Sequence, residues 1–388
     1  MEKTGIGETE FILTPATGRN FIGRSALISE LTRELGDVRS HIGFCLYGRR
    51  RVGKTSILEE VAAQLSGKSR IVVVYLSLYD IADLSAATFA QELADAVMAA
   101  YHGKGVLPMK LRLKELLGSQ LGVVAELLKG IRLEATVAEH IKLMVEHAQQ
   151  AGGRENRSEF IRQAFNTGEV LAKATATKCV LMLDEFPEMA WLDGGLQLVK
   201  MLRTQYERQS STALVISGSI KKTLELVALS QASPFYKQLV PKHVMPFTRE
   251  ETEQFLRSYL GDVGVEDLST LHELTGGMPF YLQFIGRSTR YSGKAQRAVD
   301  EFIAQEGDLF FREEFEKLSG KERLIVASLC EGPRSMSEIA EMTSEPATTV
   351  GRYLPNLMDE DVITRESRGT YALSNRLFAY WIGRKLVR

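Results

Sequence analysis

Eight residues in the first quarter of the chain combine two glycines with a lysine and a threonine at fixed spacing. The segment from Gly48 to Thr55 reads GRRRVGKT and matches the pattern G-x-x-x-x-G-K-[ST]. Such glycines allow a tight turn whose backbone amides face phosphate oxygens. Lys54 would reach the terminal phosphates of a nucleotide, and the Thr55 hydroxyl would ligate Mg²⁺. The predicted phosphate-binding residues are Gly48, Arg49, Arg50, Arg51, Val52, Gly53, Lys54, Thr55 and Ser56.

The segments on either side of this turn favour a strand and a helix. Residues 41–47 form a short apolar run, and apolar residues recur at helical spacing over 55–65. The partial positive charge at the start of a helix attracts anions, which supports phosphate binding. The alternative is a chance glycine turn before a helix. The three arginines also stay open, because each could be solvated, steady a neighbouring loop, or contact a phosphate or an acidic partner group.

A second apolar run, residues 180–183, stops at two acidic residues, Asp184 and Glu185. Asp184 is predicted to hold Mg²⁺ through water. Glu185 is predicted to orient or deprotonate an attacking water, which makes Lys54, Asp184 and Glu185 candidate catalytic residues. The alternative is an ordinary strand that ends in a polar turn. The adjacent glutamate favours hydrolysis, and no N-K-x-D guanine-binding motif follows, so ATP is favoured over GTP.

A third run, residues 212–220, ends in small hydroxyl residues. Ser217 or Ser219 is expected beside the terminal phosphate, where a hydroxyl could sense that group, and Ser219 is the candidate given a catalytic role. Alternatively, these serines cap the following helix. The sequence favours the two interpretations equally.

Composition limits the class of protein. The 388 residues are 44% hydrophobic and 25% charged, which is typical of a globular protein of about two or three domains. The net charge of −1 indicates no overall attraction to nucleic acid or membrane. Three cysteines, far apart among apolar neighbours, predict reduced buried thiols and a cytoplasmic protein. No signal peptide, transmembrane segment or metal-binding histidine spacing is expected.

The order of these motifs resembles the archaeal-type ATPase family, a branch of the STAND and AAA-like P-loop ATPases. The resemblance covers nearly the whole chain. Residues 21–31 are similar to the F-x-G-R-x-x-E-L box, residues 274–282 to the G-G-x-P lid motif, and residues 371–382 to the end of a C-terminal winged helix. The resemblance implies an α/β fold, a P-loop NTPase parallel sheet with a helical lid and a C-terminal winged helix.

The resemblance also implies roles for particular residues. Gly23 and Arg24 are expected near the base and ribose of the nucleotide, and Pro279 near the adenine. Structurally, these motifs could be only a turn and a helix stop. The chain departs from the family where Lys237-Gln238 replaces Gly-Arg and where Ser25-Ala26 replaces acidic residues. Lysine lacks the planar guanidinium of arginine, so slow hydrolysis is expected.

The remaining patterns divide the chain into three units. Residues 1–247 are predicted to form the nucleotide domain, with a parallel sheet covered on both faces and strands at 41–47, 70–78, 178–183, 213–218 and about 240–246. An insert before Asp184 shows helical spacing, then alternation that predicts a β-hairpin at about 131–147, then a polar loop at 149–158. The insert could bind a partner, although decoration that lengthens the sheet edge is favoured.

The last two units are expected to be a lid and an effector. Residues 248–316 carry only helical spacing and begin with a capping box, Thr248 with Glu251. Residues 317–388 suggest three helices, the first opened by Ser319, and two strands around Arg368, which together predict a winged helix-turn-helix. That fold often inserts a helix into the DNA major groove.

The charges of this last unit argue against DNA reading. The expected recognition helix is mostly acidic and Pro355 interrupts it, whereas phosphate contacts require basic residues. A protein-facing or lid-like role is therefore favoured, although basic residues of the wing and chain end leave a phosphate contact open: Arg365, Arg368, Arg376, Arg384, Lys385 and Arg388.

The sequence thus predicts an ATP-driven switch in which ATP, Mg²⁺ and slow hydrolysis move the winged helix relative to the core. The alternatives are an ATP-regulated DNA-binding protein and an assembly scaffold with little hydrolysis. A homo-oligomer or a partner protein is possible. Arg203 and Arg208 are candidates, by position only, for an arginine that completes a neighbour's site, and they could equally be solvated.

Overall fold

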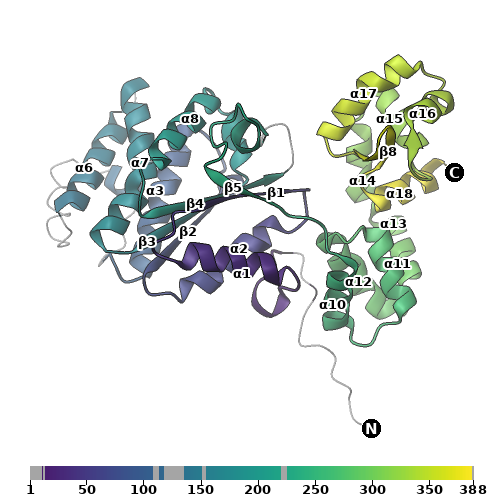
Figure 1. The fold of residues 1–388 in the computed structure, drawn as a ribbon, viewed down its shortest axis with the longest axis horizontal. Coiled ribbons are helices and arrows are strands. Elements are labelled where there is room, and N and C mark those ends of the chain that lie inside the picture. Colours follow the sequence, from purple (N-terminus) through teal and green to yellow (C-terminus); the bar gives the residue numbers. More distant parts are fainter. Residues whose placement is uncertain are drawn as a thin grey trace, which may run out of the picture.

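The computed structural model describes residues 11, 14–107, 113–117, 135–150, 154–219 and 225–386. A parallel sheet of five strands lies at the centre of the larger part, in the order β2-β3-β4-β1-β5 (Figure 1). The strands are β1 (Gly43–Gly48), β2 (Ile71–Ser77), β3 (Lys178–Asp184), β4 (Thr212–Ser219) and β5 (Leu239–His243). All five expected strands therefore form, and the α/β prediction is confirmed.

Alternate residues of the central strands face opposite layers. On β1, Phe44 and Leu46 pack in one hydrophobic cluster, and Cys45 between them packs in the other. The first layer contains α1 (Ser25–Gly36) and α2 (Lys54–Ser66), which lie below the sheet in Figure 1. Because both faces are covered, the strands are apolar along most of their length, as parallel strands usually are.

The segment between β2 and β3 is helical wherever the structure describes it. It forms η2 (Leu78–Asp80), α3 (Ala86–Gly103), α4 (Leu113–Leu117), α6 (Ala135–Gln149) and α7 (Arg154–Ala174). Helix α7 packs against α3, α6 and β3, so this insert covers the second face of the sheet (Figure 1), and no described residue of it joins the sheet.

The predicted β-hairpin at about 131–147 is wrong. Residues 135–147 lie in α6, whose buried residues Val137, Ile141, Met144 and Val145 recur at helical spacing. Those four residues form one apolar face only on a helix, whereas a short alternating pattern fits a strand or a helix equally. The predicted polar loop is also too long, because α7 begins at Arg154. Residues 108–112, 118–134 and 151–153 lie outside the described residues.

Short elements connect the strands, and a helical region follows β5. The connections include η1 (Gly18–Asn20) before α1, η3 (Phe186–Trp191) and α8 (Gly195–Tyr206) between β3 and β4, and η4 (Glu225–Leu229) between β4 and β5. The expected capping box is confirmed, because the Thr248 hydroxyl accepts a hydrogen bond from the Glu251 amide and the Glu251 carboxylate accepts one from the Thr248 amide. The helices that follow are α10 (Arg249–Leu260), α11 (Val265–Thr275), α12 (Pro279–Ser292), α13 (Ala295–Gln305) and α14 (Gly307–Glu316).

The C-terminal region, residues 317–386, packs on those helices (Figure 1). It contains the expected helices and strands and adds β6 and α18: α15 (Gly320–Ser328), β6 (Arg334–Ser335), α16 (Met336–Thr343), α17 (Ala347–Asp359), β7 (Ile363–Ser367), β8 (Thr370–Leu373) and α18 (Arg376–Leu386). The strands pair in the order β6-β8-β7. The description of this region as a winged helix, and the three domain boundaries, stay predictions. No helix in the described ranges is long and apolar enough to span a membrane.

The prediction that Pro355 interrupts the third helix of the C-terminal region is wrong. Helix α17 continues through this proline. The buried side chains of Val350, Leu354 and Leu357 hold the helix on both sides of the proline, so packing outweighs the lost backbone hydrogen bond.

The three cysteines do not share one environment. Cys45 and Cys179 lie on central strands, and burial raises the pKa of each thiol to about 12. Cys330 is only half-buried. The prediction of buried thiols is therefore confirmed for two of the three residues.

Candidate functional site

The glycine-rich turn connects β1 to α2. Gly48 ends β1 beside Ser219 of β4, and a Cβ atom at Gly48 would lie 2.3 Å from the carbonyl oxygen of Val244. Gly53 precedes α2 with a φ of 93°, a conformation that glycine adopts without steric cost. Val52 between them is fully buried. Both glycines are therefore required by backbone geometry, and the first amides of α2 lie at the turn.

Lys54 is folded over this turn. Its Nζ atom donates hydrogen bonds to the carbonyl oxygens of Gly48 and Arg49, each at 3.1 Å. The side chain is buried, and burial lowers the pKa of Lys54 although Glu185 and Asp184 oppose that shift. Among the described residues, its acceptors are these two backbone carbonyls, which belong to the turn that the sequence assigns to phosphate binding.

Asp184 receives hydrogen bonds on both carboxylate oxygens. The Thr55 hydroxyl donates to Oδ2 at 2.7 Å, and the Tyr75 hydroxyl donates to the same oxygen at 3.0 Å. The Ser217 hydroxyl and the Glu185 amide donate to Oδ1. Asp184 is 2% exposed. The structure therefore brings together the threonine and the aspartate that the sequence assigned to one metal site.

Glu185 is adjacent in sequence but differs in environment. Its φ of 51° is left-handed, a conformation that a non-glycine residue adopts at a cost and that is common at functional sites. The side chain is half-buried, and burial raises the pKa of Glu185, opposed by the nearby charge of Lys54. Two neighbouring carboxylates in unlike environments can serve different chemical roles.

The two serines of β4 lie in different places, and a tyrosine also contacts Asp184. Ser217 is fully buried and bonds Asp184, whereas Ser219 is half-buried and lines a cavity of about 630 Å³ together with Arg49, Arg50 and Arg51. Tyr75 was not anticipated. It lies on β2, the strand paired with β3, and a lone tyrosine in an apolar strand carries no motif that identifies it.

The three arginines of the turn have different partners. The Nε atom of Arg49 donates to Oδ2 of Asp361 at 2.9 Å, so this residue contacts an acidic group. Arg50 is exposed and lines the 630 Å³ cavity. Arg51, with a left-handed φ of 67°, lies over the rings of Phe280 at 4.7 Å and Phe310 at 5.2 Å. Sequence alone left these partners open because they lie more than 200 residues away.

Arg24 joins the turn to the first helix after β5. Its Nη2 atom donates to the carbonyl oxygens of Val52 at 2.6 Å and Met245 at 3.1 Å. Its amide donates to Oε1 of Glu251 at 2.8 Å, and its guanidinium lies 5.1 Å from the centre of the Phe247 ring. Burial lowers the pKa of Arg24 to about 10. These contacts make Arg24 a structural bridge, and its position near a base stays a prediction.

The other residues implied by the resemblance lie beside this bridge. Gly23 has a φ of 80°, and a Cβ atom there would lie 3.3 Å from the Phe247 ring. Gly277 of the G-G-x-P motif packs still closer, since its Cβ atom would lie 2.2 Å from the carbonyl oxygen of Phe247. Pro279 is the first residue of α12. The Ser56 hydroxyl accepts a hydrogen bond from the Ala16 amide at 3.1 Å, so it contacts the N-terminal segment.

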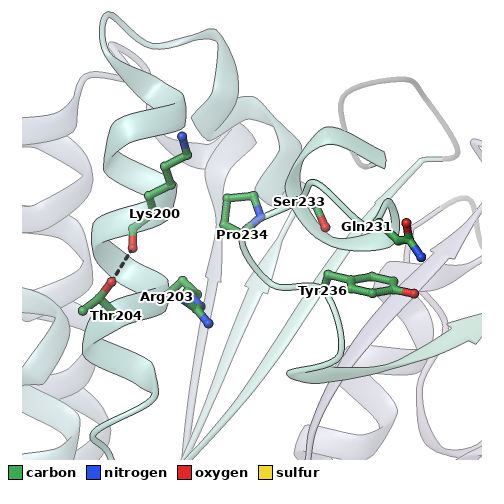
Figure 2. Close-up of a pocket in the computed structure, with 7 residues that line it drawn as sticks. All are labelled: Lys200, Arg203, Thr204, Gln231, Ser233, Pro234 and Tyr236. Carbon is green, nitrogen blue, oxygen red and sulfur yellow. Dashed lines mark hydrogen bonds between the residues drawn. The ribbon is translucent and has the colours of Figure 1, made fainter.

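The arginine-finger candidates lie on or just after α8. Arg203 pairs with Glu207 and lines a cavity of about 430 Å³. Figure 2 shows Arg203 with Lys200 and Thr204 on α8, opposite the loop of Gln231, Ser233, Pro234 and Tyr236. Arg208 is exposed. In the same loop, Lys237 lies 5.4 Å from the Tyr236 ring, and Gln238 hydrogen-bonds Glu207. The finger roles stay predictions.

Comparison with solved structures finds proteins of the same fold. The Walker-type ATPase PABY2304 of Pyrococcus abyssi matches with a TM-score of 0.70 at 19% identity, over 96% of this chain and 99% of that chain. The ORC2 protein of Aeropyrum pernix, in ADPNP-ADP complexes, matches with a TM-score of 0.58 at 12% identity, over 99% of this chain and 100% of that chain. Such low identities show the fold alone. No curated protein matches the sequence.

The family of this chain is shown by a match to a family model of protein sequences. The model described as an ATPase domain predominantly from Archaea matches residues 18–285, which include the glycine-rich turn, Asp184 and the G-G-x-P motif. The match covers well over half of the chain and confirms the expected resemblance. This protein therefore belongs to the family of P-loop ATPase domains found predominantly in Archaea.

Proposed function

We propose that this protein binds ATP with Mg²⁺ in the glycine-rich turn and hydrolyses it slowly, as a conformational switch. One observation supports the proposal above all others. Thr55 and Asp184 are 129 residues apart in the sequence, yet their side chains form a 2.7 Å hydrogen bond beside a buried lysine that caps the same turn. Family membership supports nucleotide binding independently.

The oxygen atoms at this point fit a magnesium ion. Mg²⁺ prefers hydroxyl, carboxylate and water oxygens, and Thr55 and Asp184 supply the first two. Thr55 would hold the ion directly and Asp184 through water, while Tyr75 and Ser217 orient the carboxylate. When bound, the ion would neutralise charge on the phosphates.

Other residues of the turn would act on the substrate itself. Lys54 would exchange its two carbonyl acceptors for phosphate oxygens. Glu185 would accept a proton from the attacking water or orient it, and burial raises its pKa, which makes the carboxylate a stronger base than an exposed one. Ser219, at the end of β4 beside Gly48, would sense the terminal phosphate. Arg24 and Pro279 would lie near the ribose and base.

A switch also needs parts that respond to the nucleotide. We propose a nucleotide domain of residues 1–247, a lid of residues 248–316 and a winged-helix effector of residues 317–388. Arg51 contacts Phe280 and Phe310 of the lid, so a change in the turn would alter lid contacts. The buried, reduced thiols support a cytoplasmic location.

For the effector, we favour a partner protein or a second copy of this chain over DNA. The end of α17 and the turn after it are acidic, with Asp359, Glu360 and Asp361 in sequence, and repulsion from phosphate would weaken DNA binding. An electrophoretic mobility shift at low salt, with and without ATP, tests the DNA alternative. A shift that weakens as salt rises would support DNA binding.

The central test measures ATP binding, ATP hydrolysis and mass on the purified protein, with and without DNA. Truncating a buried charged contact costs several kcal/mol, so Lys54→Ala should weaken ATP binding by about a hundredfold. Lys200→Ala is the matched control, because Lys200 is exposed in the same domain and lines the other cavity. Equal ATP affinity of Lys54→Ala and wild type would refute the proposed function.

A further inference from the structure

Arg49 of the glycine-rich turn forms hydrogen bonds with two residues of the C-terminal region. Besides its 2.9 Å contact with Asp361, Arg49 donates from Nη1 to the carbonyl oxygen of Ser374 at 2.6 Å. Asp361 lies between α17 and β7, and Ser374 directly follows β8. Arg49 therefore holds both ends of the β7–β8 hairpin with one guanidinium group.

The side-chain pair is partly shielded from solvent. The side chain of Arg49 is 25% exposed and that of Asp361 is 37% exposed, so water screens this pair less than a fully exposed one. Asp361 has a left-handed φ of 58°, a conformation that aspartate adopts more readily than most residues. The 2.9 Å distance and the partial burial of both side chains therefore carry the evidence for an ordered contact.

The same guanidinium lies in the turn that we propose binds phosphate. Arg49, Arg50 and Arg51 line the 630 Å³ cavity, and so do Asp359, Glu360 and Asp361. Arginine binds carboxylate and phosphate through the same donors. A nucleotide phosphate and Asp361 would therefore compete for Arg49, and the two anions would repel each other.

The C-terminal region is attached more firmly to the lid than to the turn. The Trp381 indole donates to Asp308 at 2.8 Å, the Tyr380 hydroxyl donates to Asp300 at 2.7 Å, and the Trp381 ring packs on Phe311. Release of Arg49 would leave all three contacts intact. The Arg49 contact is therefore separate from the contacts that hold the C-terminal region on the lid.

We propose that Asp361 is an internal anion that occupies Arg49 and holds residues 317–386 against the turn until a nucleotide phosphate displaces it. The inference rests on the proposed nucleotide function and specifies how that site is regulated. Because coupling between two binding equilibria is reciprocal, docking weakens nucleotide binding by the same factor by which nucleotide weakens docking.

The test compares Asp361→Asn with Glu360→Gln. Both variants remove one negative charge from the same turn, but only Asp361 pairs with Arg49. ADP and ATP affinities are measured with Mg²⁺ by calorimetry. Docking without nucleotide is measured by energy transfer between dyes on Asp193→Cys and Met342→Cys, two exposed positions, in a Cys330→Ser background.

Asp361→Asn should tighten nucleotide binding by about fivefold and lengthen the distance between the dyes, and Glu360→Gln should do neither. In an Arg49→Ala background, Asp361→Asn should have no further effect. The inference is overturned if Asp361→Asn binds nucleotide with wild-type affinity, or if Glu360→Gln changes the affinity as much as Asp361→Asn does. In either case, nucleotide binding by the wild-type protein would still support the proposed function. Absence of nucleotide binding by wild type would instead refute the proposed function, and the inference with it.

Discussion

The two halves of the site differ in where their partners come from. In the carboxylate half, Asp184 is held by Thr55, Tyr75, Ser217 and the backbone of Glu185, all within the sheet and its neighbouring turn. In the arginine half, Arg24, Arg49 and Arg51 contact residues of the lid or the C-terminal region: Glu251, Phe280, Tyr281, Phe310, Asp361 and Ser374.

This difference separates two tasks. The carboxylate half is assembled by strands that share one core, so its geometry does not depend on where the lid lies. The arginine half connects three regions, so its contacts change whenever those regions shift. We infer that the carboxylate half serves the chemical step and that the arginine half links that step to the rest of the chain.

The largest expected effect comes from Asp184→Asn. Loss of the carboxylate should reduce ATP turnover on the order of a thousandfold, because the metal is no longer held or charge-balanced. Energy transfer between the domain and the C-terminal region, measured without nucleotide, should stay at the wild-type value. A large change in that distance would show that the two halves are not separate.

Glu185→Gln should lower turnover by about a hundredfold while ATP binding changes little, since the residue would act on water and not on the nucleotide. The wild-type pH profile supplies a second measurement. Burial raises the pKa of Glu185, and a base works only when deprotonated. The rate should therefore fall as pH drops through that raised pKa and stay level above it. An acid limb at or below the ordinary glutamate pKa would contradict this role.

The effect of Arg51→Ala on the stability of the protein tests the contacts of the arginine half with the lid. The Arg51 guanidinium lies over two lid rings, so truncation should lower the free energy of unfolding by about 1–2 kcal/mol, or about 3 °C in melting temperature. Arg50→Ala is the control because Arg50 is exposed. Equal melting temperatures of Arg51→Ala and Arg50→Ala would mean that the ring contacts contribute nothing to the stability of the lid.

Tyr75→Phe should have the smallest effect. It removes one of the donors to Asp184 and leaves Thr55, Ser217 and the Glu185 amide in place. A single hydrogen bond contributes about 1 kcal/mol, so Mg²⁺-dependent ATP affinity should fall by less than about tenfold. The measurement is a calorimetric titration beside Asp184→Asn. A loss as large as that of Asp184→Asn would make Tyr75 more than an orienting residue.

Local patterns predicted the sheet and the carboxylate half well. The glycine-rich turn depends on residues within one segment, and a parallel strand must end at the same sheet edge as its neighbour, which places Asp184 near Thr55. The insert was predicted poorly, because the alternating residues before Val145 fit a strand as well as the helix that they form. Tyr75 could not be identified, because its role arises only from pairing of β2 with β3.

The sequence by itself therefore determined the turn, its lysine and threonine, the acidic strand end and the positions of the five strands along the chain, because spacing and hydrophobic periodicity act over a few residues. Only the tertiary structure decided which partner each arginine takes. Arg49 meets Asp361 across 312 positions of chain, and no local pattern can specify that contact. It depends on how the lid and the C-terminal region pack, through a hydrophobic core that extends from the sheet to α18.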